Sequence, residues 1–344
     1  MRRVLALTLF TLTLVGAAPG AAHATGPEDL PLSHTTAVGV HNAYEKAKFP
    51  YLADALDSGS SLLELDVWSM PTVKAWRVGH DLPLIANNNN CANGGLRAGS
   101  RDQDLKVCLD NLRDWQAAHP QHPLLIVKVE MKNGFNGQIG LGAPQLDALI
   151  TSKLGDTVFR PADLLHNNGK NFADLDSAAK ADNWPTRSEL RGKVMFEVIN
   201  GTFEMGNPFD HYWTDAELAD HLRSLSATGN IADAATWPSA LGATAGDPRV
   251  SKYADAGRRP WFVVFDGAAT SYVGGGIDPA WYDANHYFLI MTGADSVAPP
   301  IDSQHPTTAE ARARIAQLAA AHASLVTSDW LTSTGVLADV LARG

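Results

Sequence analysis

Short runs of apolar and β-branched residues recur along the chain, and amphipathic stretches separate them. Several runs are almost continuously apolar, which is typical of parallel strands that are covered on both faces. The pattern predicts eight strands: Thr36–His41, Leu62–Trp68, Trp76–His80, Leu124–Met131, Lys193–Asn200, Trp261–Asp266, Tyr287–Thr292 and Leu325–Asp329.

Helical patterns lie between these strands. Asp102–His119 carries apolar residues at helical spacing, which predicts an amphipathic helix. Thr214 with Glu217, and Thr307 with Glu310, have the three-residue spacing of a capping box. They predict two further helix starts.

Eight strands that alternate with helices predict an α/β fold, a single TIM-like (β/α)8 barrel. The chain of 344 residues exceeds the usual barrel of about 250 residues. We assign the excess to insertions at Ala227–Gly257 and Gly293–Pro306. The alternative is an open doubly wound sheet, but no glycine-rich phosphate loop follows the first strand.

The first residues have the features of a secretory signal peptide. Arg2 and Arg3 precede an apolar run, Val4–Gly16, and Ala22-His23-Ala24 is a small-x-small cleavage site. The apolar run is shorter than the ~20 residues that a membrane helix needs. We therefore predict a signal peptide at residues 1–24, a catalytic domain at 25–344, and a secreted protein without a transmembrane segment.

Composition narrows the class of protein. The chain is 45% hydrophobic and 19% charged, which excludes a disordered chain. The formal net charge is −10, from 27 Lys+Arg against 37 Asp+Glu. A field of that sign repels nucleic acid, so we expect no nucleic-acid partner.

The chain contains two cysteines, Cys91 and Cys108. An even pair in an exported protein predicts one disulfide. Cys108 shares a helical face with Leu105 and Leu112, whereas Cys91 lies in the Asn-rich stretch Asn87–Asn93. The bridge would therefore hold that loop against the helix. The alternative is two buried free thiols.

Acidic side chains gather at the predicted strand ends, where barrel enzymes place their active sites. Glu64 and Asp66 alternate on one strand, so both face the barrel interior, and Glu130 ends another strand. With the Asn42 amide oxygen they form an all-oxygen ligand set that suits Ca²⁺. The alternative is that the acids pair with Lys128 or an arginine.

Two histidines, His41 and His80, end strands beside these acids. Their intrinsic pKa suits a general acid and a general base. As metal ligands instead, they would imply zinc or manganese. Lys128 should share the interior face with Glu130, where it either contacts a phosphate or balances the acids. Asp266 and Asp329 end late strands. They either bind hydroxyls of the substrate, or have a surface role or support other site residues.

Four motifs together carry a resemblance to a known family. They are, in chain order, His41-Asn42-Ala43-Tyr44, Glu64-x-Asp66-x-Trp68, His80, and Glu130 in a Val-Lys-Val-Glu run. This set resembles the Ca²⁺-dependent phosphoinositide phospholipase C family, above all its secreted bacterial members.

The resemblance implies cleavage of phosphatidylinositol at a membrane interface, to diacylglycerol and an inositol phosphate, by a stand-alone monomeric domain. It implies that Ca²⁺ activates the attacking inositol hydroxyl and neutralises phosphate charge. His41 would stabilise the transition state, His80 would act as general acid, and Glu64 would accept the hydroxyl proton. The implied Ca²⁺ ligands are Asn42, Glu64, Asp66 and Glu130.

One position departs from the eukaryotic members that the chain resembles. Their fifth strand continues with lysines that bind ring phosphates, whereas this chain continues with Glu197-Val198-Ile199-Asn200. An acid at Glu197 should repel a ring phosphate. We therefore expect a preference for phosphatidylinositol over its bisphosphate.

Two other functions fit part of the pattern. A glycerophosphodiester phosphodiesterase also uses Glu-x-Asp and a later His-Asp, here His80-Asp81. It differs at the first strand, where such enzymes have His-Arg-Gly in place of His41-Asn42. A non-enzymatic Ca²⁺-dependent lipid- or sugar-binding protein would use the acids but not the histidine pair.

Overall fold

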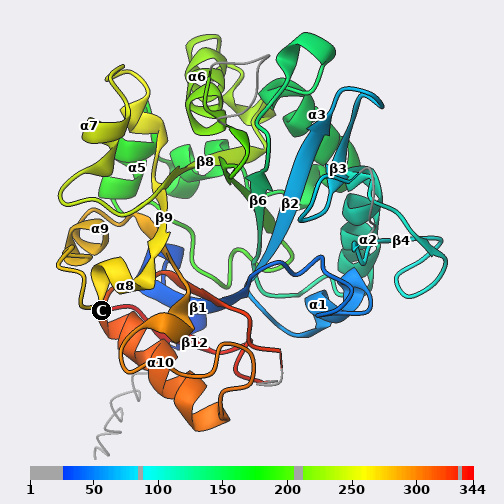
Figure 1. Cartoon of the computed structure of the whole chain (residues 1–344). Helices are drawn as coiled ribbons and strands as arrows, with labels where there is room; N and C mark the ends of the chain where they lie inside the picture. Colours follow the sequence, from blue (N-terminus) through cyan, green and yellow to red (C-terminus); the bar gives the residue numbers. More distant parts are fainter. Residues whose placement is uncertain (1–25, 84–87, 205–211, 332–334) are drawn as a thin grey trace, which may run out of the picture.

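The computed structural model describes residues 26–83, 88–204, 212–331 and 335–344. Parallel strands form a closed ring with helices outside it (Figure 1). The predicted (β/α)8 barrel is confirmed. The ring strands are β1 (Thr35–Val40), β2 (Leu62–Met70), β6 (Leu125–Met131), β7 (Val194–Asn200), β8 (Thr236–Leu241), β9 (Val264–Ala268), β10 (Phe288–Thr292) and β11 (Leu325–Ser328).

Strand β1 closes the barrel because it pairs in parallel with both β11 and β2. Gly39 lies at this closure. A Cβ there would stand 2.9 Å from both Leu62 Cβ and Leu325 Cδ2, so the close approach of the three strands requires glycine. A short strand, β12 (Val340–Ala342), pairs in antiparallel orientation with Thr35–Ala37, the first residues of β1.

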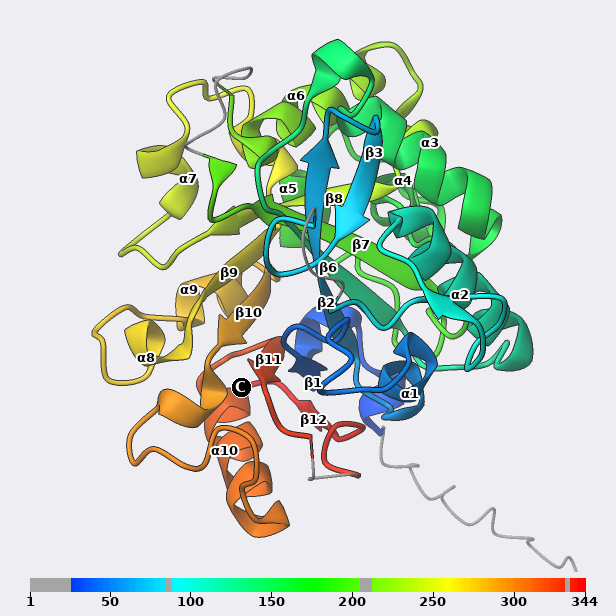
Figure 2. The same cartoon turned by 45° about the vertical axis from the view of Figure 1, so that its right-hand side comes forward.

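The predicted strand Trp76–His80 exists, but it is not a barrel strand. Strand β2 continues beyond the ring to Met70, turns, and returns as β3 (Ala75–Val78), which pairs with it in antiparallel register (Figure 2). The sequence pattern had placed it among the eight strands of the barrel. The structure corrects the interpretation: β3 is the outer half of a hairpin that stands on the mouth of the barrel.

The strand that replaces it in the ring is β8, which lies inside the stretch predicted to be an insertion, Ala227–Gly257. Its sequence, Thr-Trp-Pro-Ser-Ala-Leu, contains a proline and no β-branched run, so the sequence pattern argues against a strand. The segment nevertheless forms a strand, because its side chains are buried. Trp237 is fully buried, and Pro238 stands opposite Val198 in the parallel register with β7.

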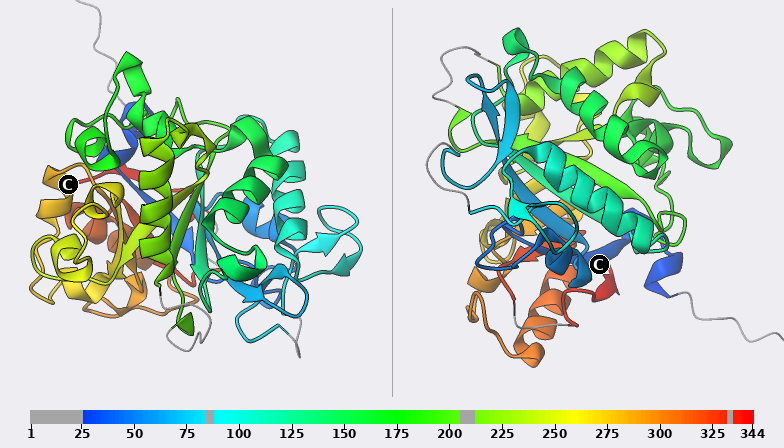
Figure 3. Two further views of the ribbon diagram at one scale, coloured as in Figure 1. Left: turned by 90° about the horizontal axis from the view of Figure 1, so that it is seen from above. Right: turned by 90° about the vertical axis from the view of Figure 1, so that its right-hand side faces the viewer.

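Helices surround the strands on the outside, as two further views show (Figure 3). The described helices are α1 (Leu52–Asp57), α2 (Leu105–Ala118), α3 (Ala143–Leu154), α4 (Pro161–Leu165), α5 (Leu175–Lys180), α6 (Thr214–Ala227), α7 (Pro248–Lys252), α8 (Ala269–Tyr272), α9 (Ala280–Ala284) and α10 (Thr308–Ala320). None of them is both long and apolar enough to span a bilayer. The predicted signal peptide, residues 1–24, lies outside the described residues.

All three predicted helices form, and one of the two predicted capping boxes forms with them. Helix α2 begins after Asp104, whose carboxylate accepts the Lys106 N–H, and α10 has the predicted capping box of Thr307 and Glu310. At α6 the predicted box does not form. Loop side chains satisfy its first N–H groups instead: Glu204 accepts from Thr214 N–H, and Asn200 accepts from Asp215 N–H.

Side-chain alternation along β2 separates the core from the site. Leu63 and Leu65 point outward and pack against α1 and α2 with Leu112. Burial of each leucine stabilises the fold by about 1.5–3 kcal/mol. Because these residues fix the outward face, Glu64 and Asp66 are held on the inward face, although burying carboxylates is unfavourable by itself.

The predicted disulfide joins Cys91 to Cys108 on helix α2. It anchors the loop that carries Asn90. The Asn90 side-chain amide donates to the carbonyls of Ala43 (2.8 Å) and Phe49 (3.1 Å). The disulfide therefore supports the segment that follows β1, which contains Asn42.

Removing the disulfide should destabilise the fold. In the double variant Cys91→Ala/Cys108→Ala, we expect the free energy of unfolding to fall by about 3 kcal/mol, because the unfolded chain loses a constraint on a loop of 17 residues. Chemical denaturation measures the change. The wild-type protein unfolded in reductant provides the control and should match the variant. An unchanged denaturation midpoint would contradict the prediction.

Candidate active site

A cavity of about 380 Å³ opens at the end of the barrel where the strands finish. Its walls come from all eight ring strands, β1, β2 and β6 to β11, or from the residues that follow them. The lining residues that carry charge are His41, Glu64, Lys128, Glu130, Asp266, Asp295 and Asp329. This is the end at which barrel enzymes carry their active sites.

Three carboxylates converge on neighbouring strands at this mouth. Asp66 stands opposite Glu130 in the parallel register of β2 and β6, and Glu64 lies two residues before Asp66. One oxygen from each of the three lies within 4.8 Å of the others. The structure thus brings together the three acids that the sequence predicted as metal ligands.

Asn42 completes this group from the end of β1. Its backbone has a positive φ of 50°, a conformation that asparagine tolerates better than most residues. Its N–H donates to Glu64 Oε2 at 3.3 Å. Its side-chain oxygen Oδ1 is buried and has no hydrogen-bond partner within the described part of the chain. A buried amide oxygen in this state is suited to a cation.

Two lysines balance the acids, so the alternative interpretation of the acids is realised in part. Lys128 Nζ lies 3.3 Å from Glu64 Oε1 and 2.7 Å from Asp266 Oδ2. The sequence had not pointed to Lys132, whose Nζ lies 3.1 Å from both Asp66 Oδ2 and Glu130 Oε1. The alternation Lys128-x-Glu130-x-Lys132 was the available signal.

The two lysines do not neutralise the group completely. Burial, together with the charges of Glu130 and Glu64, raises the pKa of Asp66 to about 6, although Lys132 opposes the shift. Burial also favours the protonated form of Glu64, but Lys128 and His41 outweigh it and lower the pKa of Glu64. Excess negative charge therefore remains at Asp66 and Glu130, where a divalent cation would be stabilised.

A loop after β7 closes over this group. Thr202 N–H donates to Glu130 Oε1 at 2.9 Å, and Phe203 N–H donates to the Lys132 carbonyl at 2.8 Å. The loop can lie this close only because residue 201 is glycine, since a Cβ there would stand 2.0 Å from the Met131 carbonyl oxygen. The Phe203 ring stacks on Trp68, with centroids 5.3 Å apart.

His41 occupies the wall next to Glu64. Its Nε2 lies 3.6 Å from Glu64 Oε2, and its Nδ1 lies 3.1 Å from Asp329 Oδ1. Lys48 Nζ contacts the same Asp329 oxygen at 2.7 Å and donates to the His41 carbonyl at 3.0 Å. Asp329 thus orients the imidazole, a role that its position after a late strand did not reveal.

The pKa values follow from this arrangement. Burial favours neutral His41, but the Asp329 hydrogen bond and the Glu64 charge outweigh it, so the pKa of His41 is raised. Burial also raises the pKa of Asp329, yet the hydrogen bonds from His41 and Lys48 lower it to about 2.

His80 lies beside the mouth but outside the cavity lining. The Gly79 N–H donates to the Asp66 carbonyl at 3.0 Å, which holds the end of β3 at the level of the acids. The His80 side chain is 53% exposed, and its Nδ1 lies 3.4 Å from Asp81 Oδ1. The structure therefore places His80 near the acids, although it comes from the hairpin and not from the ring.

The remaining predicted substrate residues differ in position. Asp266 lines the cavity, where Lys128 holds it. Glu197 stands opposite Lys128 in register but is fully buried and does not line the cavity. Burial and the Asp266 charge raise the pKa of Glu197 to about 8. Direct contact between Glu197 and a ring phosphate, the basis of the selectivity argument, is not supported by this position.

Comparison with known proteins identifies the family. Residues 95–236 match the family model described as phosphoinositide phospholipase C, Ca²⁺-dependent. A solved Ca²⁺-dependent phosphatidylinositol-specific phospholipase C from Streptomyces antibioticus is 52% identical over 91% of this chain and 99% of its own, with a TM-score of 0.87. The chain belongs to the Ca²⁺-dependent phosphoinositide phospholipase C family.

A more distant structure agrees on the fold. A calcium-dependent phosphoinositol-specific phospholipase C from a Pseudomonas species is 20% identical, with a TM-score of 0.68, over 92% of this chain and 96% of its own. No curated protein matches. The family-model match spans Glu130 but ends before Asp266 and begins after His80, so the remaining site residues rest on geometry.

The pairing of His41 with Asp329 predicts how this part of the site responds to pH. The depressed pKa of Asp329 contributes stability above about pH 4 that is lost as the pH falls towards 2. The raised pKa of His41 contributes stability below about pH 6.5 that is lost as the pH rises through its folded value. The pair should therefore contribute most between those limits.

In Asp329→Asn we expect a lower pKa for His41, because the variant removes the negative charge next to the imidazole and weakens its hydrogen-bond acceptor. Imidazole NMR shifts recorded through a pH titration measure it. His166, which lies on an exposed turn after α4, serves as the internal reference. An unchanged His41 titration would show that Asp329 does not control the imidazole.

Proposed function

We propose that the protein is a Ca²⁺-dependent phospholipase C that cleaves phosphatidylinositol to diacylglycerol and an inositol phosphate. The observation that carries the proposal is the convergence of the Glu64, Asp66 and Glu130 carboxylates. His41 lies beside Glu64, and Asn42, whose N–H donates to Glu64, has a buried side-chain oxygen without a hydrogen-bond partner among the described residues. Membership of the family and 52% identity to the Streptomyces antibioticus enzyme support it.

The donor set fits calcium. Three carboxylates and one amide oxygen provide only hard oxygen ligands, and the site opens to a cavity that admits water. Asn42, Glu64, Asp66 and Glu130 would hold the ion, and Lys132 would have to yield its contacts with Asp66 and Glu130. When bound, calcium would lower the pKa of the inositol hydroxyl and neutralise phosphate charge.

The protein's own groups divide the proton transfers. We assign Glu64 as the acceptor of the hydroxyl proton when the inositol oxygen bonds to phosphorus. His41, oriented by Asp329, would donate hydrogen bonds to the phosphoryl oxygen as negative charge develops there. The bond from phosphorus to the glycerol oxygen then breaks, and His80 would protonate that oxygen. Water could next open the cyclic inositol phosphate.

The character of the cavity favours an unphosphorylated ring. Five acids line it, against the single lysine Lys128, which Glu64 and Asp266 already engage. Extra phosphates on the inositol ring would meet acids here without a free lysine to offset them. This reasoning supports a preference for phosphatidylinositol over its bisphosphate on grounds other than Glu197.

Exposed apolar side chains around the mouth support action at a lipid surface. They follow the ends of β2, β3 and β7, the same strands that carry the site. The five are Val73 (51% exposed), Leu82 (43%), Phe203 (55%), Tyr212 (65%) and Trp213 (43%). Aromatic and aliphatic side chains in this position suit the interface between headgroups and acyl chains.

Export is the matching proposal for location. The N-terminal residues carry the features of a signal peptide, and the Cys91–Cys108 disulfide suits an oxidising compartment. The monomeric state stays a prediction.

Incubation with phosphatidylinositol vesicles tests the proposed function directly. We expect an inositol phosphate product with Ca²⁺ and its loss with a chelator, because the acids need the ion to bind substrate phosphate. Glycerophosphoinositol and the bisphosphate should be poorer substrates. The Glu130→Gln variant should need a higher Ca²⁺ concentration for activity. Calorimetric titration with Ca²⁺ in the absence of substrate should show the same weaker affinity. Activity that is indifferent to chelation, or fastest on the soluble diester, would overturn the proposal.

The role of His80 has a separate test. His80→Ala should lower kcat by about 10²–10⁴-fold, because the leaving oxygen loses its proton donor. Calcium affinity should be retained, since His80 is not among the proposed ligands. His166→Ala, a substitution of an exposed histidine away from the mouth, is the matched control and should keep full activity. A loss of calcium binding in His80→Ala would assign His80 to the metal site. Full activity of the variant would show that another group protonates the leaving oxygen.

A further inference from the structure

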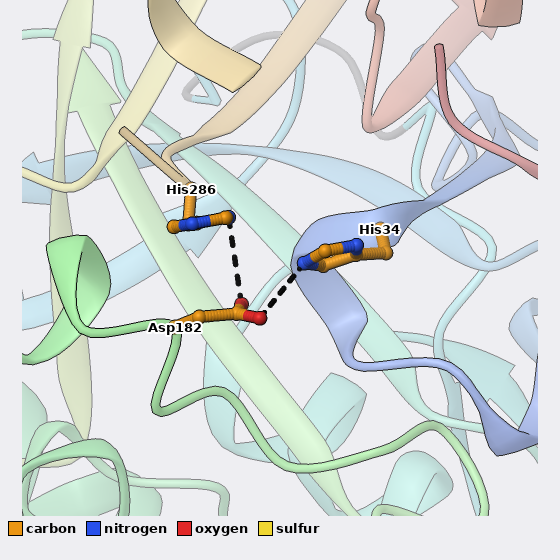
Figure 4. A group of neighbouring side chains, drawn as sticks. All are labelled: His34, Asp182 and His286. Carbon is orange, nitrogen blue, oxygen red and sulfur yellow. Dashed lines mark hydrogen bonds and ion pairs between the residues drawn. The ribbon is translucent and has the colours of Figure 1, made fainter. Parts of the chain in front are cut away.

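A second group of metal-ligand side chains lies at the opposite end of the barrel. His34 ends a short 3-10 turn, Leu32–His34, directly before β1, and His286 lies two residues before β10. Asp182 follows helix α5. Figure 4 shows the two imidazoles approaching the Asp182 carboxylate from different segments, with one ring nitrogen of each directed to it.

The distances are close to those that ligands of one ion have. His34 Nε2 lies 2.9 Å from Asp182 Oδ2, and His286 Nδ1 lies 3.5 Å from Asp182 Oδ1. One ligand atom from each residue lies within 4.8 Å of the others. Neighbouring ligands of a tetrahedral zinc stand roughly 3.3 Å apart, given zinc–nitrogen bonds of about 2.0–2.1 Å.

The backbone fixes two of the three ligands. Asp182 and His286 each occupy the left-handed position directly after a helix end, with φ of 50° and 56°. Asp182 N–H donates to the Ala179 carbonyl, and His286 N–H donates to the Asp283 carbonyl. Glycine usually takes this position because a side chain is unfavourable there. The two side chains are thus presented from rigid helix ends and not from a mobile loop.

The donor chemistry differs from that of the mouth. Two imidazole nitrogens with one carboxylate form a set that prefers zinc or a related transition-metal ion over calcium. The side chains are between 28% and 41% exposed, so an ion and a completing water can reach them. Ser33 Oγ donates to Asp182 Oδ1 at 3.0 Å and steadies the carboxylate.

We propose that His34, Asp182 and His286 form a zinc site at the end of the barrel opposite the cavity. The ion would join the entry to β1, the end of α5 and the entry to β10, three segments far apart in the sequence. Its effect would be on stability, because this end of a barrel serves the fold and the other end serves catalysis. An ion pair in which Asp182 bridges two histidines is the competing account.

Calorimetry with zinc on metal-stripped protein tests the proposal near neutral pH. Saturating calcium is present throughout, so that the acids at the mouth are engaged. We expect one zinc per chain, and an affinity that falls more than about tenfold in Asp182→Asn and in His286→Gln. At zinc a hundredfold above its dissociation constant, the Tm should rise on the order of 5 °C in the wild type and not in the variants.

Two control variants make the outcome specific. His322→Gln alters a histidine at the equivalent left-handed position after α10. This histidine pairs with Asp283 at 2.8 Å but belongs to no group of three metal-ligand side chains in the described part of the chain. The variant should bind zinc like the wild type, and so should Glu130→Gln. Loss of zinc only in Glu130→Gln would place the ion at the mouth. Absence of stoichiometric binding, or binding unchanged in both ligand variants, would establish the ion-pair account.

Discussion

Repulsion among the carboxylates at the barrel mouth is the constraint around which the site is arranged. Two carboxylates about 4 Å apart repel by about 4 kcal/mol at an effective dielectric constant of 20. Outward-facing leucines on β2 hold Glu64 and Asp66 inward regardless of this cost. The structure offsets the repulsion with Lys128 and Lys132, each of which contacts two acids.

This offset leaves the site ready for a cation of higher charge. A single ammonium group between the two carboxylates of Asp66 and Glu130 balances only part of their charge. A divalent ion brings twice the charge and can accept the Asn42 oxygen as well, which a lysine at the observed position does not engage. The lysine therefore stabilises the fold without satisfying the whole ligand set.

Periodicity was enough to predict the barrel and the acid cluster, because side chains two apart on a strand must share a face. It failed where tertiary contacts override local preference. Pro238 argued against β8, yet burial of Trp237 against Phe159 and Trp184 retains the strand in the ring. The two errors at β3 and β8 cancelled in the strand count. Asp329 could not be placed beside His41, since their proximity depends on how β11 closes against β1.

The β2–β3 hairpin also sets a length. Met70, the last residue of β2, is the fourth residue after Asp66. The strand therefore extends about 13 Å beyond the acids. Val73 is exposed at the tip of the hairpin. The hairpin thus fixes the distance between the reacting groups and any surface that its tip contacts. Removing two residues from each strand would shorten this distance by about 7 Å and keep every side chain on its face of the strand. Removing one residue would move the side chains to the opposite face.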